Sequence, residues 1–293
     1  MKLLFFLIAL PGLLLAQGSD NTTTWTVGTV TATTVPPADF KSREALQPPG
    51  IVPRAGLASP TRVPWINANG WRFRRNHAAK FAYDVPAGKG ALAAAEAFAY
   101  GADAVVKIDP ADAADVGKMM AFLKSLPTVD LPDVADLQVV DDGSAIVGEV
   151  MNLLTRRNLL FSIVKGKASD APKTVRVGST DYPVEQAADP SAFAQKVRHD
   201  LTDEKRSLRM FGSEVVIARL TSDGKRARLH LLNYTGRELE GLRISLLGSY
   251  KEDQTYIAGP GQAKLLEFAL AGGRTEFSLP RIGAYTVIDL AAQ

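Results

Sequence analysis

The sequence predicts an α/β plus all-β fold: a partial parallel α/β layer of the Rossmann or flavodoxin type, followed by a C-terminal antiparallel β-sandwich. Before about residue 205, apolar runs of strand length alternate with segments of helix length, which is typical of parallel sheets with crossover helices. From Ser207 onward, apolar residues recur at every second position, as in Leu242, Ile244 and Leu246. This alternation and the turn pair Asp223-Gly224 predict antiparallel strands joined by hairpins.

The N-terminus predicts export. Residues 1–16 carry a lysine at position 2, continue as an almost unbroken apolar run and end on the small residue Ala16. The run is too short for a stable membrane span, so we interpret 1–16 as a signal peptide, with a short membrane anchor as the alternative. We expect a secreted or periplasmic bacterial protein with no stable membrane insertion after signal cleavage. Residues 17–62 are rich in Thr and Pro and are expected to form an arm or linker, with one exposed strand in 24–35.

The α/β domain is expected over residues 63–166. Asp109-Pro110 and Ser144 are predicted helix starts, because Asp and Ser side chains cap exposed backbone amides and Pro fits the first helical turn. Asn158 is expected to end the second of these helices, since Asn tolerates the left-handed backbone of a helix terminus. The expected strands cover 63–67, 71–73, 104–109, 136–141 and 159–164, and a further helix covers 88–100.

A connecting segment, 167–206, is expected to hold one helix that begins after the capping residue Asp189. The β-sandwich domain then covers 207–293, which gives room for about seven strands.

Composition excludes several classes of site. The chain has no cysteine, which excludes disulfides, a thiol nucleophile and cysteine metal ligands. His77, His199 and His230 are scattered without the spacing of a ligand set, so we expect neither a metal site nor a cofactor. A net charge of +3 is too small to indicate a nucleic acid partner.

Four segments resemble three parts of barrel glycoside hydrolases of the β-galactosidase type. GADAVVKID (101–109) resembles the closing strand of their (β/α) barrel. ADLQVVDDGSAIVGEVMNLLTRRNLLFSIV (135–164) resembles the opening of the amidotransferase-like trimerisation domain that follows the barrel. RARLHLLNYTGRELEGLRISLLG (226–248) and FSLPRIGAYTVIDL (277–290) resemble the terminal β-domain.

The chain also departs from that family. A complete barrel needs about 200 residues or more, and too few precede Asp136, so the resemblance implies a C-terminal part with the catalytic barrel largely missing. Family members carry their catalytic acid as a glutamate directly after an asparagine, and this chain contains no Asn-Glu pair. An amidotransferase needs a cysteine nucleophile, which is absent too.

Paired carboxylates are the first candidates for chemistry, because glycoside hydrolysis requires two of them. Asp109, Asp141 and Asp142 follow predicted parallel strands, where ligands usually bind, and they are the candidate catalytic residues. The alternative is structural, since Asp109 precedes a helix and Asp142-Gly143-Ser144 forms a turn into the next one.

A dense group of Trp, Asn and Arg side chains is the best candidate for sugar contact. Indole faces stack on sugar rings, and Asn and Arg side chains bond hydroxyl groups. The alternative is that both tryptophans anchor the core. The candidate carbohydrate-binding residues are Trp65, Asn67, Asn69, Trp71 and Arg72.

These patterns together predict an exported, carbohydrate-associated protein, a non-catalytic or degenerate relative of glycoside hydrolases. One alternative is an active glycoside hydrolase that uses the carboxylates at the strand ends. Another is a structural envelope protein that oligomerises. An oligosaccharide and a second copy of the chain are the expected partners.

Overall fold

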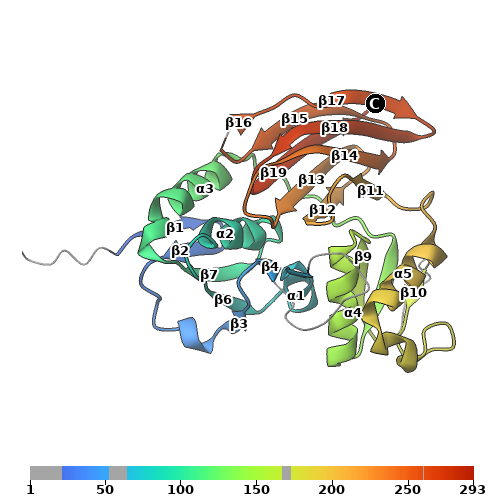
Figure 1. The fold of residues 1–293 in the computed structure, drawn as a ribbon, viewed down its shortest axis with the longest axis horizontal. Helices are drawn as coiled ribbons and strands as arrows, with labels where there is room; N and C mark the ends of the chain where they lie inside the picture. Colours follow the sequence, from blue (N-terminus) through green and yellow to red (C-terminus); the bar gives the residue numbers. More distant parts are fainter. Residues whose placement is uncertain (1–21, 53–64, 167–172, 260) are drawn as a thin grey trace, which may run out of the picture.

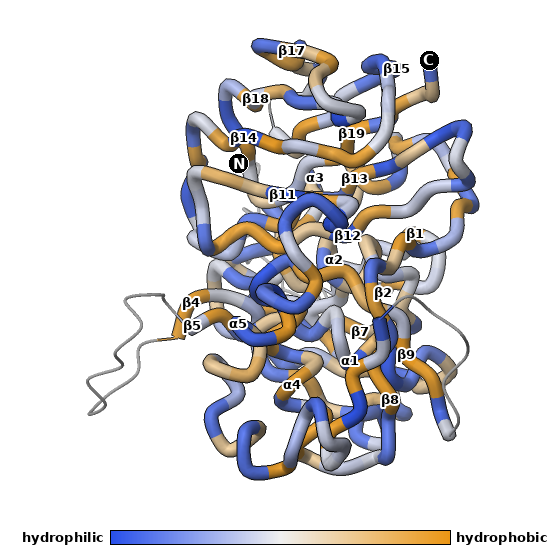
Figure 2. The backbone as a smooth tube through the Cα atoms, turned by 90° about the vertical axis from the view of Figure 1, so that its right-hand side faces the viewer, coloured by the Kyte–Doolittle hydropathy of each residue, from blue (hydrophilic) through white to orange (hydrophobic). Residues whose placement is uncertain are grey.

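The computed structural model describes residues 22–52, 65–166, 173–259 and 261–293. The predicted signal peptide, 1–16, lies outside these residues. Figure 1 shows two α/β parts with a β-sandwich above them, which confirms the predicted fold class. Figure 2 shows from the side that the sandwich lies above the α/β parts. Among the described residues, no helix combines the length and the apolar character needed to cross a membrane.

The first α/β part contains a five-stranded sheet whose strands, in spatial order, are β1 (Thr24–Val27), β2 (Val30–Thr33), β7 (Asp103–Lys107), β6 (Lys80–Asp84) and β3 (Glu44–Leu46). All neighbours pair in parallel except β1 and β2, which form an antiparallel hairpin. Helix α2 (Gly90–Ala99) crosses from β6 to β7, and α3 (Ala113–Ser125) follows β7. The sheet is open, as a barrel reduced to a few units would be.

The segment predicted as an arm, 17–62, is part of this fold over its described residues. It supplies β1, β2 and β3, together with β4 (Gly50–Val52), which pairs antiparallel with β5 (Trp65–Asn67). Val30 and Ala32 are 1% and 0% exposed, so β2 is a buried inner strand and not the exposed one expected. These strands are three or four residues long, and the prolines between them give the segment the composition of a linker.

The second α/β part is a separate parallel sheet, in the order β10 (Thr174–Val175), β8 (Leu137–Asp141) and β9 (Phe161–Lys165). Helix α4 (Ala145–Arg156) joins β8 to β9, and α5 (Pro190–Leu201) packs against α4. Both helix starts are capped as predicted, since Ser144 Oγ accepts from the amide of Val147 and Asp189 Oδ1 from that of Ala192. The α/β region is thus two sheets and not the single layer expected.

A short helix, α1 (Gly70–Arg75), takes the place of the strand expected at 71–73. The alternation of aromatic and arginine residues imitates a strand, but the helix buries Phe73 in the core of the first α/β part and Trp71 in the core of the second. A side chain at position 70 has no room, because a Cβ there would lie 2.3 Å from the ring of Tyr100. Gly70 therefore lets α1 begin directly against Tyr100, the residue that caps the C-terminus of α2.

The sandwich contains two antiparallel sheets. One has the order β11 (Leu208–Phe211), β14 (Leu239–Leu247), β18 (Arg274–Ile282) and β17 (Leu266–Ala271). The other has the order β12 (Val216–Ser222), β13 (Arg226–Asn233), β19 (Tyr285–Ala292), β15 (Tyr250–Ile257) and β16 (Gly261–Gln262). The predicted hairpin at Asp223-Gly224 joins β12 to β13, with Gly224 at a φ of 83°.

The second sheet of the sandwich buries its outer face against the first α/β part. Leu232, Tyr285 and Val287 belong to the same apolar cluster as α2 and α3. The rings of Phe98 and Phe122 meet the ring of Tyr285 edge-on, with centroids 6.5 and 6.1 Å apart. This apolar contact joins the two parts into one core.

A buried carboxylate lies where these parts meet. Glu96 of α2 is 0% exposed. Its Oε1 accepts from the Asn69 amide at 2.7 Å and from the Tyr234 hydroxyl at 2.6 Å. Its Oε2 accepts from the Tyr83 hydroxyl at 2.6 Å and from Asn69 Nδ2 at 3.1 Å. Burial raises the pKa of Glu96, and the bonds from Tyr234, Tyr83 and Asn69 oppose that shift.

We predict that Glu96→Ala lowers the free energy of unfolding by about 3 kcal/mol, because it leaves the hydroxyls of Tyr83 and Tyr234 buried without their acceptor. Tyr234→Phe removes a single donor and is expected to cost about 1–2 kcal/mol. Denaturant titration measures both. The control is Asp115→Ala on the exposed side of α3, and an equal effect of Glu96→Ala and the control contradicts the account.

Candidate functional site

A cavity of ≈ 580 Å³ opens at the carboxyl ends of β8 and β9, and we name it the strand-end cavity. The carboxyl ends of parallel strands are where α/β folds usually bind ligands. Four predicted site residues meet here, Trp71 and Arg72 from α1 and Asp141 and Asp142 from the end of β8. The complete lining is Glu44, Trp71, Arg72, Arg75, Asn76, Asp141, Asp142, Gly143 and Lys165.

Asp141 and Arg75 form a fixed ion pair in the wall of this cavity. Arg75 Nη2 and Nε donate to the two carboxylate oxygens at 2.7 and 3.1 Å, and the Gly143 amide donates to Oδ1 at 2.9 Å. Burial disfavours the charged carboxylate, but the bonds from Arg75 and Gly143 outweigh it and lower the pKa of Asp141. Asp141 is therefore ionised and held in place at neutral pH.

The other two candidate carboxylates cap backbone amides. Asp142 Oδ1 accepts from the Ser144 amide at 2.8 Å, and hydrogen bonds from Ser144 lower the pKa of Asp142. Asp109 Oδ1 accepts from the Ala111 amide at 2.9 Å and follows β7, in a different sheet from Asp141. A glycosidase acid needs a raised pKa to hold its proton at neutral pH. The pKa values of Asp141 and Asp142 are lowered instead, and each of the three candidates makes the capping or turn bond that the structural alternative predicts.

Trp71 meets the cavity only at its margin. It is 8% exposed, and the Arg72 guanidinium lies 4.5 Å from the centre of its ring. The far edge of the indole packs on α4, where a Cβ on Gly148 would lie 3.2 Å from two ring carbons. The strand-end cavity thus offers a ligand polar groups, from Arg72, Asn76 and Asp142, more than an open aromatic face.

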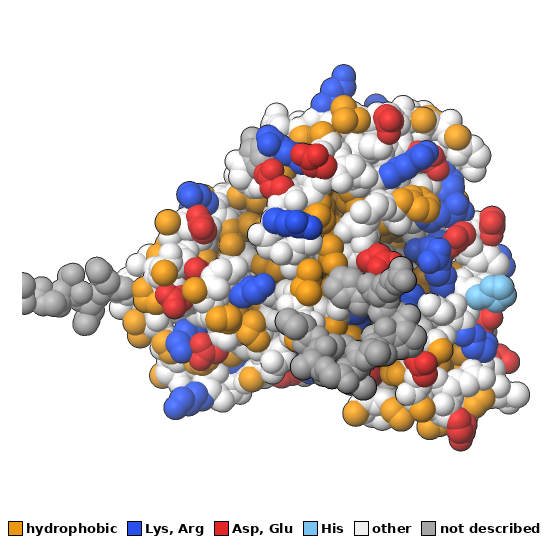
Figure 3. All heavy atoms as spheres, in the orientation of Figure 1, with side chains coloured by type: hydrophobic (Ala, Val, Ile, Leu, Met, Phe, Trp, Pro, Cys, Tyr) orange, Lys and Arg blue, Asp and Glu red, His pale blue; other side chains and the backbone are white. Residues whose placement is uncertain are grey.

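A second cavity, of ≈ 430 Å³, lies between the second α/β part and the sandwich, and we name it the arginine cavity. Figure 3 shows Lys and Arg side chains gathered on the right of the molecule where these two parts meet. The end of α4, the start of α5 and strand β11 form its walls. The complete lining is Trp65, Glu149, Leu153, Arg156, Arg157, Asn158, Asp189, Pro190, Ser191, Arg198, Asp203, Arg206, Arg209, Met210, Phe211, Ser213 and Glu214.

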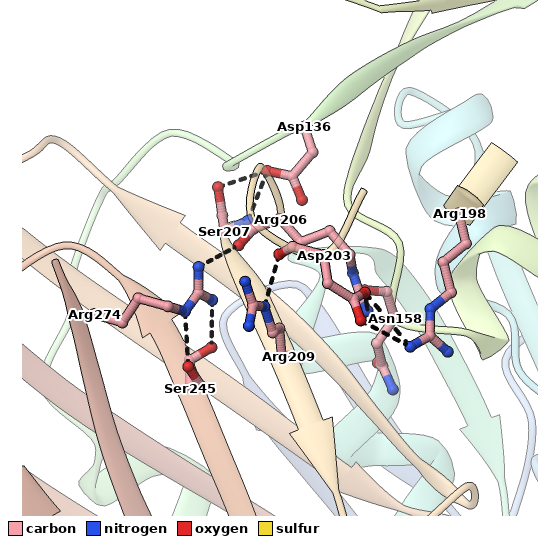
Figure 4. A network of polar contacts seen from close by, with 9 residues as sticks. All are labelled: Asp136, Asn158, Arg198, Asp203, Arg206, Ser207, Arg209, Ser245 and Arg274. Atoms are coloured by element: carbon pink, nitrogen blue, oxygen red, sulfur yellow. Dashed lines mark hydrogen bonds and ion pairs between the residues drawn. The ribbon is translucent and has the colours of Figure 1, made fainter. Parts of the chain in front are cut away.

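Hydrogen bonds fix several of these arginines (Figure 4). Asp203 Oδ1 accepts from Arg206 Nη1 at 3.0 Å, and Asp203 Oδ2 from Arg198 Nη2 at 3.4 Å. Arg209 Nε donates to the Asp203 carbonyl at 2.7 Å. The same polar network continues into the sandwich, where Arg274 Nη1 donates to the Arg206 carbonyl at 3.0 Å.

The predicted sugar-contact residues are divided among three environments. Trp65 lines the arginine cavity, where the Arg156 guanidinium lies 4.0 Å from its ring centre. Asn69 is 3% exposed and holds Glu96. Asn67 pairs with Gly50 in the β4–β5 ladder and lines neither cavity.

Sequence reasoning missed Arg75 and Lys165 in the strand-end cavity and nearly all of the arginine cavity. The arginines at 198, 206 and 209 stand close together in the sequence, which is a visible signal. Nothing local indicates that they face Arg157 at the end of α4. Within the described residues, no group of His, Asp and Glu side chains is arranged to hold a metal ion.

Comparison with solved structures finds proteins of similar fold. An α-L-fucosidase, isoenzyme 2 from Paenibacillus thiaminolyticus, matches with a TM-score of 0.56 and 11% identity over 76% of this chain. The chain has a glycoside-hydrolase-like fold. The likeness is one of fold, and it confirms at that level the resemblance seen in the sequence. This chain covers 62% of the fucosidase chain.

Two β-galactosidases also match, at lower TM-scores. One is a cold-adapted enzyme from Rahnella sp. R3, with a TM-score of 0.43, 10% identity, and coverage of 69% of this chain and 51% of that chain. The other is a catalytic mutant of a GH42 β-galactosidase from G. stearothermophilus, with a TM-score of 0.41, 8% identity, and coverage of 84% and 53%. No protein-family model and no curated protein sequence matches the chain.

We predict that Asp141→Asn lowers the free energy of unfolding at pH 7 by about 1–2 kcal/mol, because it removes the charge that Arg75 binds. The pKa of Asp141 is lower in the folded state than its unfolded value of about 3.9. Its contribution is therefore present above that value and is lost as the pH falls through the folded pKa. Denaturant titrations at pH 7 and at about pH 3 measure the difference, which should shrink at the lower pH.

The matched control for this change is Asp115→Asn, whose side chain is 79% exposed. An Asp141→Asn effect that stays constant between the two pH values would show that the ion pair does not supply the stability.

Proposed function

We propose that this chain is an exported carbohydrate-binding protein that holds sugar in the strand-end cavity without hydrolysing it. The observation that carries the proposal is the meeting of Arg72, Asn76 and Asp142 at the carboxyl ends of β8 and β9. Export rests on the signal-like composition of residues 1–16.

The chemistry of the lining suits a polyhydroxylated ligand. An arginine presents several N–H donors, an ionised aspartate presents only acceptors, and an asparagine presents both. Sugar hydroxyls donate and accept, so adjacent hydroxyls match such a mixed set. A volume of ≈ 580 Å³ lies within the usual range for small-molecule sites.

We infer that the sugar is not hydrolysed because each carboxylate of the cavity is already engaged. Glu44 accepts from Asn76 Nδ2 at 3.4 Å and lies 3.8 Å from Arg72 Nη1. Asp141 is committed to Arg75 and Asp142 to the Ser144 amide, and both have lowered pKa values. Hydrolysis needs one carboxyl that stays protonated until it donates to the leaving group. The fold likeness to an α-L-fucosidase supports a sugar as the class of ligand.

The proposal is tested by thermal unfolding of residues 17–293 against a panel of neutral and acidic oligosaccharides. We expect a dose-dependent rise in Tm with one sugar class, because a ligand of the native state stabilises it by mass action. Arg72→Ala is expected to weaken the response about tenfold, since it removes donors from the cavity rim. Product analysis after prolonged incubation should find the sugar intact.

The control is Arg243→Ala, which removes an exposed guanidinium from the sandwich, outside the cavity lining. A sugar response that Arg72→Ala leaves unchanged would place binding elsewhere. Released product would contradict the non-catalytic assignment.

A second candidate function is assembly into an oligomer. Strand β17 lies at the edge of its sheet, and its Leu266 and Leu270 are 46% and 44% exposed. Exposed apolar edge strands pair readily with other chains. A flat thermal response to every sugar, combined with a mass in solution that rises with concentration, favours this alternative.

A further inference from the structure

We propose that the arginine cavity is a second binding site, independent of the strand-end cavity, for a small ring-shaped ligand that carries an oxyanion. The oxyanion is a carboxylate, sulfate or phosphate group, and acidic sugars are ring compounds of this kind. The cavity combines guanidinium groups that retain free donors with an exposed aromatic ring.

Two arginines of the lining lack a carboxylate partner among the described residues. Arg157 makes one hydrogen bond, from Nη2 to Ser191 Oγ at 2.8 Å. Arg209 also makes one, from Nε to the Asp203 carbonyl at 2.7 Å. A guanidinium has five N–H donors, so each of these groups retains donors for a ligand. Paired N–H donors match the two oxygens of an oxyanion.

The carboxylates in the cavity wall do not occupy those donors. Asp203 is engaged with Arg206 and Arg198, and Asp189 caps α5. Glu149 accepts from Asn152 at 3.3 Å on its own helix. Glu214 lies in an exposed loop and attracts Arg157 without forming an ion pair with it.

Arg206 lies in the wall of the cavity as a largely buried positive charge. Its side chain is 6% exposed, and its Nε has no hydrogen-bond partner among the described residues. Buried polar groups are nearly always hydrogen-bonded in native proteins. The Nε atom is itself buried, so Arg206 supplies its positive charge to the cavity and not this donor.

The positive charges also crowd one another. Burial lowers the pKa of Arg157 and of Arg206, and the nearby charge of Arg198 lowers both further. All three guanidiniums stay charged at neutral pH because arginine is not deprotonated in proteins. An anion among them relieves this repulsion, whereas a neutral ligand does not.

Apolar side chains also line the cavity. Phe211, at the end of β11, is 50% exposed, and Met210 and Leu153 also line the cavity. An exposed ring beside charged groups suits the face of a sugar or of another flat ring. A volume of ≈ 430 Å³ fits a ligand of that size.

Isothermal titration of the full chain with glucuronate, glucose and inorganic sulfate tests the proposal. We expect glucuronate to bind and glucose not to, with an affinity that falls as salt is raised from ~50 to ~500 mM. The double variant Arg157→Gln, Arg209→Gln should bind glucuronate at least about tenfold more weakly. Phe211→Ala should weaken glucuronate and leave sulfate unchanged.

The matched control is the double variant Arg226→Gln, Arg243→Gln, which removes two exposed guanidiniums of the sandwich and should bind glucuronate as the unmodified chain does. Arg72→Gln, in the strand-end cavity, should also leave glucuronate binding unchanged, which separates the two proposals. Equal affinity for glucose and glucuronate, equal affinity for sulfate and glucuronate, or no binding of glucuronate would each overturn the proposal.

Discussion

The fold depends on the buried carboxylate of Glu96. This one side chain binds the turn before α1, strand β6 and the residue that follows β13, so three separate segments share it. A carboxylate loses much hydration energy on burial, and four donors at 2.6 to 3.1 Å are needed to replace it. The geometry therefore fixes how the sandwich sits on the first α/β part. It also sets the position of α1, which carries Arg72 and Arg75 into the strand-end cavity.

A second set of polar contacts holds the other α/β part against the sandwich. Asn158 adopts a left-handed conformation with a φ of 52°, donates to the Val216 carbonyl and accepts from the Ala218 amide. Asp136 accepts from the Ser207 amide and hydroxyl at 3.0 and 2.5 Å, and Arg274 binds Ser245 and the Arg206 carbonyl (Figure 4). Each candidate cavity lies where separate parts of the chain meet. Both proposed binding sites thus lie where parts of the fold meet.

Local chemistry was predictable from the sequence. The caps at Asp109, Ser144 and Asp189 depend on a few neighbouring residues, and each forms as expected. Strand β2 was harder, because its burial depends on β7, which follows about seventy residues later. The arginine cavity could not be predicted, because it requires α4, α5 and β11 to converge. Only two of the five candidate sugar-contact residues, Trp71 and Arg72, line the strand-end cavity. Asn69 instead binds the buried Glu96, and Asn67 pairs with Gly50 between β4 and β5.

The most direct test of the central claim is a crystal structure of the chain grown with the oligosaccharide that stabilises it most. We expect an unbroken sugar in the strand-end cavity, with its hydroxyl groups within hydrogen-bond distance of Arg72 and Asp142 and with the Arg75–Asp141 pair unchanged. A cleaved sugar, or a sugar bound only outside this cavity, would contradict it.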